Sequence, residues 1–176
     1  MLILVGGLKD SGKDYFSDLL VSSVSGFKKV SYANEIKIMI CNMFGIKMSE
    51  FENAKKLRTE ISIGDVVVSD MRKFIQNFGT EVMQSSFGVD VWSEKLFDVI
   101  QNLDEDFIIS DFRFKREYEF LLENYNGKII TIWIENSNLK SDKHQSENDL
   151  LDFDFDLKID NSNRKSISLN KLLELF

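Results

Sequence analysis

The chain has 176 residues, a formal net charge of −7 and a pI near 4.8. This length predicts one domain with a substantial core, and the acidic balance argues against broad binding of a nucleic-acid polymer or an anionic membrane. The sequence shows no signal peptide and no apolar run long enough to span a bilayer, and its single cysteine, Cys41, excludes a disulfide scaffold within one chain. We therefore expect a cytoplasmic protein in which Cys41 is a small core residue.

The first predicted element is a buried strand at residues 2–5, which leads directly into a glycine-containing loop. Residues 7–13 fit the G-x-x-x-x-G-K pattern of phosphate-binding loops, and the apolar spacing after them predicts a helix. The helix dipole contributes only about 0.3–1 kcal/mol per interaction with an anion, so the Lys13 ammonium is expected to supply the full charge. Asp14 stands where Ser or Thr usually ligates Mg²⁺, and it must replace that role or leave the loop impaired.

The rest of the chain alternates between predicted strands and helices. Further strands are expected at residues 27–32, 107–111, 128–134 and 155–159. Further helices are expected at residues 33–44, 70–87 (with a break allowed at Gly79 and Thr80), 89–103, 115–124, 142–151 and 166–176. The polar segment 47–65 is either one or two short helices or a mobile flap, and the sequence does not distinguish between them. This order predicts a three-layer α/β/α architecture with a mainly parallel five-stranded sheet.

Ligands of such sheets bind beyond the carboxyl ends of the strands, where the glycine loop and Asp111 both fall. Arg113 and Glu117 follow Asp111 closely and gather opposite charges there. Asp111 could orient an attacking phosphate oxygen or stand near Mg²⁺, and Arg113 could neutralise a transferring phosphoryl group. The alternative is a surface turn with solvated charges followed by a helix that carries an ion pair.

Two further groups of residues have weaker signals. Arg72 and Gln76 stand four apart on one helix face, which suits a bidentate contact to a substrate phosphate, although a solvated helix face is the favoured explanation of this spacing taken alone. His144, the single histidine, could be a metal ligand or a general base, but it has no Cys or His partner for a metal site. A capping role for Ser146 beside Glu147 is the simpler interpretation. Lys140 and Lys143 could form a basic lid.

In this order, the segments resemble the phage deoxynucleoside monophosphate kinases, a branch of the P-loop nucleoside monophosphate kinase superfamily. The matching segments are GLKDSGKD at residues 7–14, ANEIK at 33–37, RKFIQNFGTE at 72–81, Trp92 with Lys95, DFRFKRE at 111–117 and HQSE at 144–147. They extend over most of the chain, and the ordered set is more specific than any single member.

The resemblance implies a P-loop kinase fold over residues 1–176 and transfer of the ATP γ-phosphoryl group to a deoxynucleoside monophosphate, with Mg²⁺. It also implies a helical substrate-binding region at about residues 34–103 and a lid-like segment at about 136–151. Carried over by position, the residues expected to bind ATP are Gly7, Lys9, Asp10, Ser11, Gly12, Lys13, Asp14 and Tyr15. The catalytic set would be Lys13, Asp14, Arg72, Asp111, Arg113 and Glu117. The substrate-binding set would be Arg72, Gln76, Trp92 and Arg113, and the residues near the metal would be Asp14 and Asp111.

The chain departs from this family pattern at Tyr15, where Thr is usual, and in lacking a proline near residues 33–35. Segment 47–65 is also shorter than the insertion of larger relatives, so the preferred base is not predicted. Two alternatives stay open: another P-loop small-molecule kinase, such as a phosphomevalonate or dephospho-coenzyme A kinase, and a catalytically inactive nucleotide-binding module. The resemblance is compatible with a homodimer, and it implies the host cytoplasm if the protein is encoded by a phage.

Overall fold

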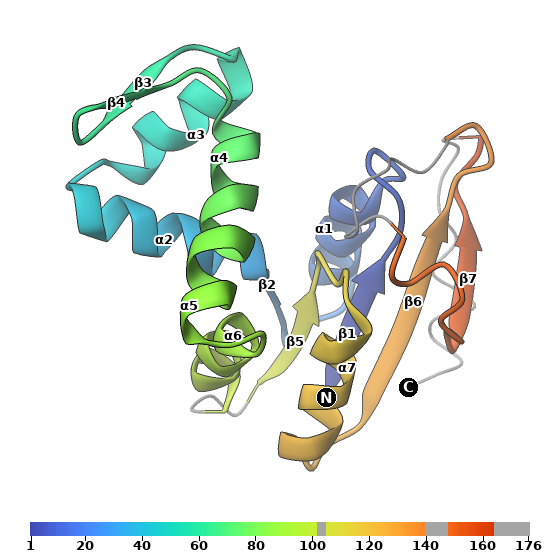
Figure 1. Ribbon diagram of the computed structural model, residues 1–176. Helices are drawn as coiled ribbons and strands as arrows, with labels where there is room; N and C mark the ends of the chain where they lie inside the picture. Colours follow the sequence, from blue (N-terminus) through green and yellow to red (C-terminus); the bar gives the residue numbers. More distant parts are fainter. Residues whose placement is uncertain (102–104, 140–147, 164–176) are drawn as a thin grey trace. The chain divides into compact units, whose positions relative to one another are not determined.

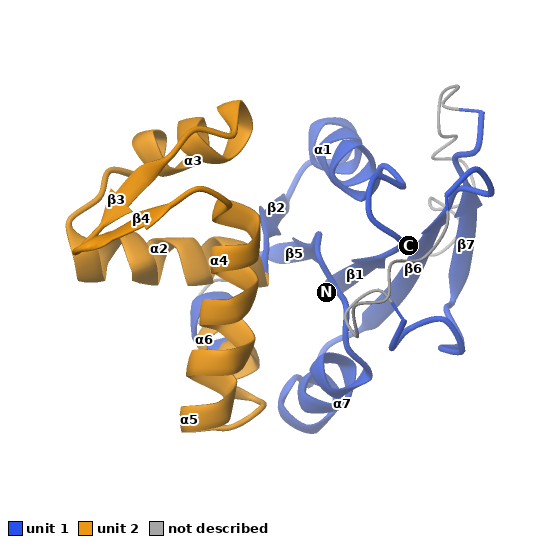
Figure 2. Cartoon of the chain, turned by 45° about the horizontal axis from the view of Figure 1, so that its top comes forward, with its two compact units in different colours: residues 1–31, 97–176 blue, residues 32–96 orange. Residues whose placement is uncertain are grey.

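The computed structural model describes residues 1–101, 105–139 and 148–163 (Figure 1). The chain forms two compact units (Figure 2). Unit 1 comprises Met1–Ser31 and Phe97–Phe176, and unit 2 comprises Tyr32–Leu96. The predicted helix at residues 166–176 and the segment around His144 lie outside the described residues.

The core of unit 1 is a five-stranded sheet in which all strand pairs are parallel. Its strands are β1 (Leu2–Gly6), β2 (Phe27–Val30), β5 (Asp106–Ile109), β6 (Ile129–Glu135) and β7 (Leu157–Asp160), in the order β2-β5-β1-β6-β7. The central strand, β1, is buried throughout, as its uninterrupted apolar sequence predicts for a strand covered on both faces. The predicted five-stranded, mainly parallel sheet is confirmed.

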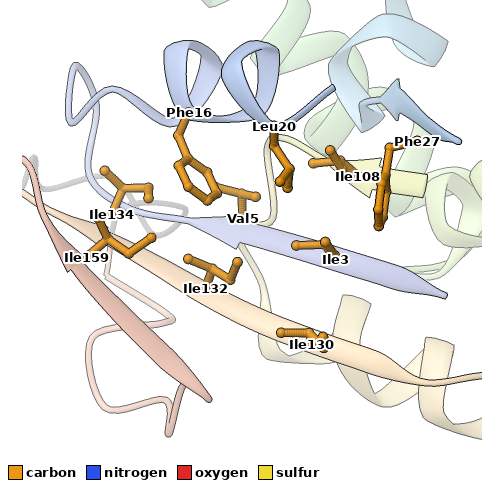
Figure 3. Close-up of a cluster of buried hydrophobic side chains, with 10 residues drawn as sticks. All are labelled: Ile3, Val5, Phe16, Leu20, Phe27, Ile108, Ile130, Ile132, Ile134 and Ile159. Atoms are coloured by element: carbon orange, nitrogen blue, oxygen red, sulfur yellow. The ribbon is translucent and has the colours of Figure 1, made fainter. Parts of the chain in front are cut away.

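Helices cover both faces of this sheet. Figure 2 shows α1 (Lys13–Ser23) and α7 (Lys115–Asn124) on opposite sides of it. Under α1, Phe16 and Leu20 are fully buried against a row of aliphatic side chains from the strands (Figure 3). On the other face, α7 buries Phe120 and Leu121, and the Phe120 ring meets Phe97 edge-on with centroids 6.1 Å apart. The three-layer α/β/α architecture is therefore confirmed.

Unit 2 is mainly helical. Its elements are α2 (Tyr32–Phe44), α3 (Met48–Leu57), β3 (Ile61–Ile63), β4 (Val66–Val68), α4 (Met71–Asn77), η1 (Phe78–Gln84), α5 (Ser85–Phe87) and α6 (Val91–Ile100), the last of which continues into unit 1. Segment 47–65 thus contains one helix, which was one of the predicted alternatives, and the first half of an antiparallel hairpin that was not predicted. The hairpin turns at Gly64 and Asp65, and a glycine followed by an acidic residue is a known signal for such a turn.

The predicted helix at residues 70–87 is continuous, but its middle section, η1, is a π-helix instead of a break. Gly79 lies in this section and packs closely against α2. A Cβ atom at Gly79 would stand 2.9 Å from Cδ1 of Ile36. The indole N–H of buried Trp92 donates a 2.9 Å hydrogen bond to the Gly79 carbonyl oxygen. A widened turn re-aims its carbonyl groups, and here a side-chain donor satisfies one of them.

The prediction of a helix at residues 142–151 is wrong for its described part, because residues 148–152 form turns. Asp149 accepts a 2.7 Å hydrogen bond from the Lys115 N–H, and Asp152 lies 2.7 Å from Lys115 Nζ. Elsewhere, Cys41 is buried as expected, and in the described parts of the chain we find no helix long and apolar enough to cross a membrane.

Candidate active site

The glycine loop, residues 7–13, connects β1 to α1 at the carboxyl edge of the sheet. Its backbone takes left-handed conformations at Gly7 (φ 149°), Asp10 (φ 63°) and Gly12 (φ 101°). A Cβ atom at Gly7 would stand 2.6 Å from the Ile134 carbonyl oxygen, and one at Gly12 would stand 2.3 Å from Nδ2 of Asn161. Both glycines are therefore required by conformation and by close neighbours.

Two polar side chains are held inside this loop. Lys13 Nζ donates to the carbonyl oxygens of Gly7 (2.6 Å) and Leu8 (2.7 Å), so the ammonium lies over the loop backbone. The hydroxyl of Ser11 is fully buried and has no hydrogen-bond partner among the described residues. Burying an unpaired hydroxyl costs roughly 1–3 kcal/mol. A bound anion whose oxygen accepts from Ser11 would recover that cost, so the loop has the donors that a phosphate requires.

The next two residues face solvent. The Asp14 side chain is 83% exposed and lies 3.1 Å from Lys29 Nζ, which also contacts Asp18 at 2.9 Å. Burial by itself would lower the pKa of Lys29, but the bonds to Asp18 and Asp14 outweigh it and raise that pKa. Tyr15 is 58% exposed. A metal ion at Asp14 would therefore compete with Lys29 for the carboxylate. Lys9 and Asp10 are exposed at the tip of the loop.

Asp111 emerges at the same edge of the sheet as the glycine loop. It follows β5, which pairs in parallel with β1 so that Ile109 stands beside Leu4. Parallel neighbours end at one edge, so the loop and Asp111 both follow the carboxyl ends of adjacent strands, as the sequence predicts. Arg113 is partly buried just beyond it.

Glu117 acts on the backbone of this segment. One oxygen of its carboxyl group accepts from the N–H groups of Arg113 (2.8 Å) and Phe114 (3.1 Å) at the start of α7. Burial raises the pKa of Glu117 to about 8, the two backbone hydrogen bonds oppose this rise, and the charge of Asp111 adds to it. Glu117 therefore holds the Arg113 backbone in place as a largely neutral group at pH 7.

The remaining predicted site residues belong to unit 2. Arg72 is exposed in the first turn of α4, and Gln76 is half-buried one turn later. The helix starts at Asp70, whose carboxylate accepts from the N–H groups of Arg72 (3.1 Å) and Lys73 (3.0 Å). Trp92 is buried and hydrogen-bonded inside the unit. That these residues contact a substrate stays a prediction.

One residue that contacts the glycine loop was not predicted from the sequence. Asn161 follows β7 and donates from Nδ2 to the Ser11 carbonyl oxygen at 2.8 Å, although the two residues are 150 positions apart. A single asparagine after a strand carries no local signal of such a contact. Within residues 1–101, 105–139 and 148–163 we find no group of three or more His, Cys, Asp or Glu side chains that could hold a metal ion.

A family model for deoxynucleotide monophosphate kinase matches residues 45–172, which is well over half of the chain. The chain belongs to the deoxynucleotide monophosphate kinase family. Comparison with curated proteins gave no match. The matched range contains Arg72, Trp92, Asp111 and Glu117, whereas the glycine loop lies before it. The loop geometry and the family assignment are therefore independent observations, and the predicted membership of this kinase family is confirmed.

Proposed function

We propose that this family member transfers the γ-phosphoryl group of ATP to a deoxynucleoside 5′-monophosphate, giving the diphosphate and ADP. Family membership supports a nucleotide monophosphate as the acceptor. The observation that carries the proposal for the donor is the glycine loop, in which a lysine ammonium and a buried unpaired hydroxyl lie in one tight turn.

The loop would bind the phosphates of ATP through backbone and side-chain donors. Lys13 Nζ would exchange its bonds to the Gly7 and Leu8 carbonyl oxygens for charge-assisted bonds to phosphate oxygens, which are roughly twice as strong as neutral ones. The Ser11 hydroxyl would gain an acceptor at the same time. Binding would therefore include a local rearrangement of the loop, in which Lys13 Nζ leaves the two carbonyl oxygens and the buried Ser11 hydroxyl becomes accessible.

The residues at this edge also fit a magnesium ion. Mg²⁺ is normally bound by one or two carboxylates together with substrate phosphates and water. Asp14 and Asp111 are the proposed carboxylates. When bound, the ion would neutralise part of the charge on the transferring phosphoryl group.

The acceptor would be held by arginines. Arg72, with Gln76 one turn later on α4, would bind the acceptor monophosphate, and Trp92 would support that region from within unit 2. Arg113 would stabilise the transferring phosphoryl group, with its backbone fixed by Glu117. A general base is not needed, because a phosphate monoester is largely dianionic at pH 7. Residues 34–103 as a substrate-binding region and 136–151 as a lid, within one domain, belong to the same proposal.

An acceptor panel tests the reaction. The purified protein is incubated with Mg·ATP and each of the four common deoxynucleoside monophosphates, with phosphomevalonate and dephospho-coenzyme A as comparison acceptors, and ADP release is measured. We expect turnover of at least one deoxynucleotide and of neither comparison acceptor. ATP binding without turnover of any acceptor would instead support an inactive nucleotide-binding module.

Substitution of two positively charged side chains tests their roles in the reaction. We expect Lys13→Ala and Arg113→Ala each to lower kcat by at least about 100-fold, or roughly 2.7 kcal/mol, with the fold intact by circular dichroism. Lys28→Ala is the matched control, because Lys28 forms an exposed ion pair with Glu105 on the edge of the sheet. Wild-type kcat in a folded Lys13→Ala protein would remove Lys13 from the mechanism.

A further inference from the structure

Asn161 is a buried polar residue that contacts the glycine loop from another strand. Only 8% of it is exposed, and its side-chain amide donates to the Ser11 carbonyl oxygen at 2.8 Å. The fit is close, because a Cβ atom at Gly12 would stand 2.3 Å from the same amide nitrogen. The amide thus fills the space beside Gly12 that a side chain would otherwise occupy.

The backbone around Asn161 is held by hydrogen bonds from the neighbouring strand. The Asn161 N–H donates to the Glu135 carbonyl oxygen at 2.8 Å. One residue on, the Ser162 hydroxyl accepts from the Ser137 N–H at 2.9 Å, and the Ser162 carbonyl oxygen accepts from the Asn138 amide at 2.9 Å. These bonds join the ends of β6 and β7. They hold the Asn161 backbone in a fixed position. A side chain that orients another group needs such rigid support.

The bond to Ser11 determines how one peptide unit of the loop is turned. In a trans peptide the carbonyl oxygen and the following N–H point in opposite directions. The Ser11 carbonyl points toward Asn161, so the Gly12 N–H points away from it. The φ of 101° at Gly12 is accessible to glycine, which by itself would leave this peptide free to turn.

We propose that Asn161 is a positioning residue for the phosphate donor: it locks the Ser11–Gly12 peptide so that the Gly12 N–H is presented to a phosphate oxygen. The role rests on the proposed function in that the loop must bind the phosphates of ATP. Asn161 does not touch the nucleotide in this scheme. It acts through the loop backbone, beside the buried Ser11 hydroxyl.

The test measures binding of ATP and of inorganic tripolyphosphate by titration calorimetry, with steady-state kinetics beside it. We expect Asn161→Ala to bind both ligands about ten-fold more weakly, which corresponds to the loss of one oriented hydrogen bond. Asn161→Asp keeps the shape but cannot donate, and its charge opposes phosphate, so its loss should be at least as large. The KM for ATP should rise while the KM for the deoxynucleotide stays unchanged.

Asn124→Ala is the matched control. Asn124 also donates its side-chain amide to a backbone carbonyl, that of Phe120 at 2.8 Å, but it does so at the end of α7. If the role of Asn161 is purely structural, Asn161→Ala should lower the melting temperature, as we expect for Asn124→Ala, and leave the affinity of the folded protein unchanged.

The outcomes separate the two proposals. Wild-type affinity for tripolyphosphate in both folded Asn161 variants would overturn the role of Asn161. If the wild-type protein binds tripolyphosphate but transfers no phosphoryl group, the proposed function fails, and a ten-fold loss in Asn161→Ala still supports the positioning role. Absence of any binding by the wild-type protein would overturn both.

Discussion

The carboxyl group of Glu117 stands in surroundings that favour its neutral form. Its ordinary pKa of 4.5 is raised to about 8, first by burial and then by the charge of Asp111, against the opposing effect of two backbone N–H groups. The sequence places Glu117 and Arg113 in one charged cluster, and in the structure the Glu117 carboxyl group accepts a hydrogen bond from the Arg113 backbone N–H. Sequence spacing identifies Arg113 and Glu117 as neighbours but not which of their atoms form the hydrogen bond. The path of the backbone before α7 determines that the Arg113 N–H is the donor.

This shift predicts a pH-dependent stability. Between pH 4.5 and about 8 the folded protein binds one more proton at Glu117 than the unfolded chain does, so the free energy of unfolding falls as the pH rises. The slope from this group is at most about 1.4 kcal/mol per pH unit. Glu117→Gln cannot ionise and keeps an oxygen acceptor. We therefore expect its stability relative to wild type to increase from pH 5 to pH 8, measured by urea unfolding.

Glu123→Gln provides the comparison, since Glu123 is exposed on the same helix and pairs with Arg116 at 3.1 Å. Its stability difference from wild type should change little over this pH range. If the stability difference between Glu117→Gln and wild type also stays constant with pH, Glu117 titrates normally in the folded protein.

At the scale of elements, the π-helix η1 depends on a side chain from α6. The Gly79 carbonyl oxygen is satisfied by the buried indole N–H of Trp92, and a larger residue at position 79 would require the end of the Ile36 side chain in α2 to shift. The sequence predicted Trp92 as a substrate contact from family resemblance alone. The structure adds a packing role, which the helical period could not reveal because the hydrogen bond joins two different helices.

We expect Trp92→Phe to lower the free energy of unfolding by about 1–3 kcal/mol, since phenylalanine leaves the Gly79 carbonyl without its donor. Urea unfolding measures this loss. Trp133→Phe is the matched control, because Trp133 lies on β6 and contributes ring packing against Phe155 at 5.1 Å. An unchanged stability in Trp92→Phe, with a raised KM for the deoxynucleotide, would instead assign Trp92 to the substrate alone.

At the scale of the whole molecule, one continuous segment forms unit 2, and the two stretches that flank it complete the sheet of unit 1. The sheet places β1 between β5 and β6, with all five of its residues buried. The hairpin β3–β4 is the opposite case, because its strands have three residues each and Val66 and Val67 are 61% and 62% exposed. Local stability should therefore differ strongly along the chain.

Hydrogen–deuterium exchange followed by mass spectrometry checks this difference. We expect peptides from β1 and β6 to exchange most slowly and peptides that cover the hairpin to exchange early, since a two-stranded hairpin is marginal without further packing. Slower exchange in the hairpin than in β1 would show that another chain or ligand covers it.

Elements with local signals can be predicted from the amino-acid sequence. A continuous apolar run predicts β1, the glycine pattern predicts the loop after it, and helical spacing predicts α7 with its observed bounds. The hairpin at Gly64 was missed because its strands are too short for periodicity to stand out in a polar segment.

Contacts between residues that are distant in the sequence become visible once the chain is folded. Asn161 reaches Ser11 because β7 ends at the edge of the sheet where the glycine loop follows β1, and the sequence carries no trace of this contact between residues 150 positions apart. Likewise, Glu117 titrates far from its ordinary pKa because folding buries it beside Asp111. Strand order and burial are properties of the folded chain, so the final geometry of the site had to come from them.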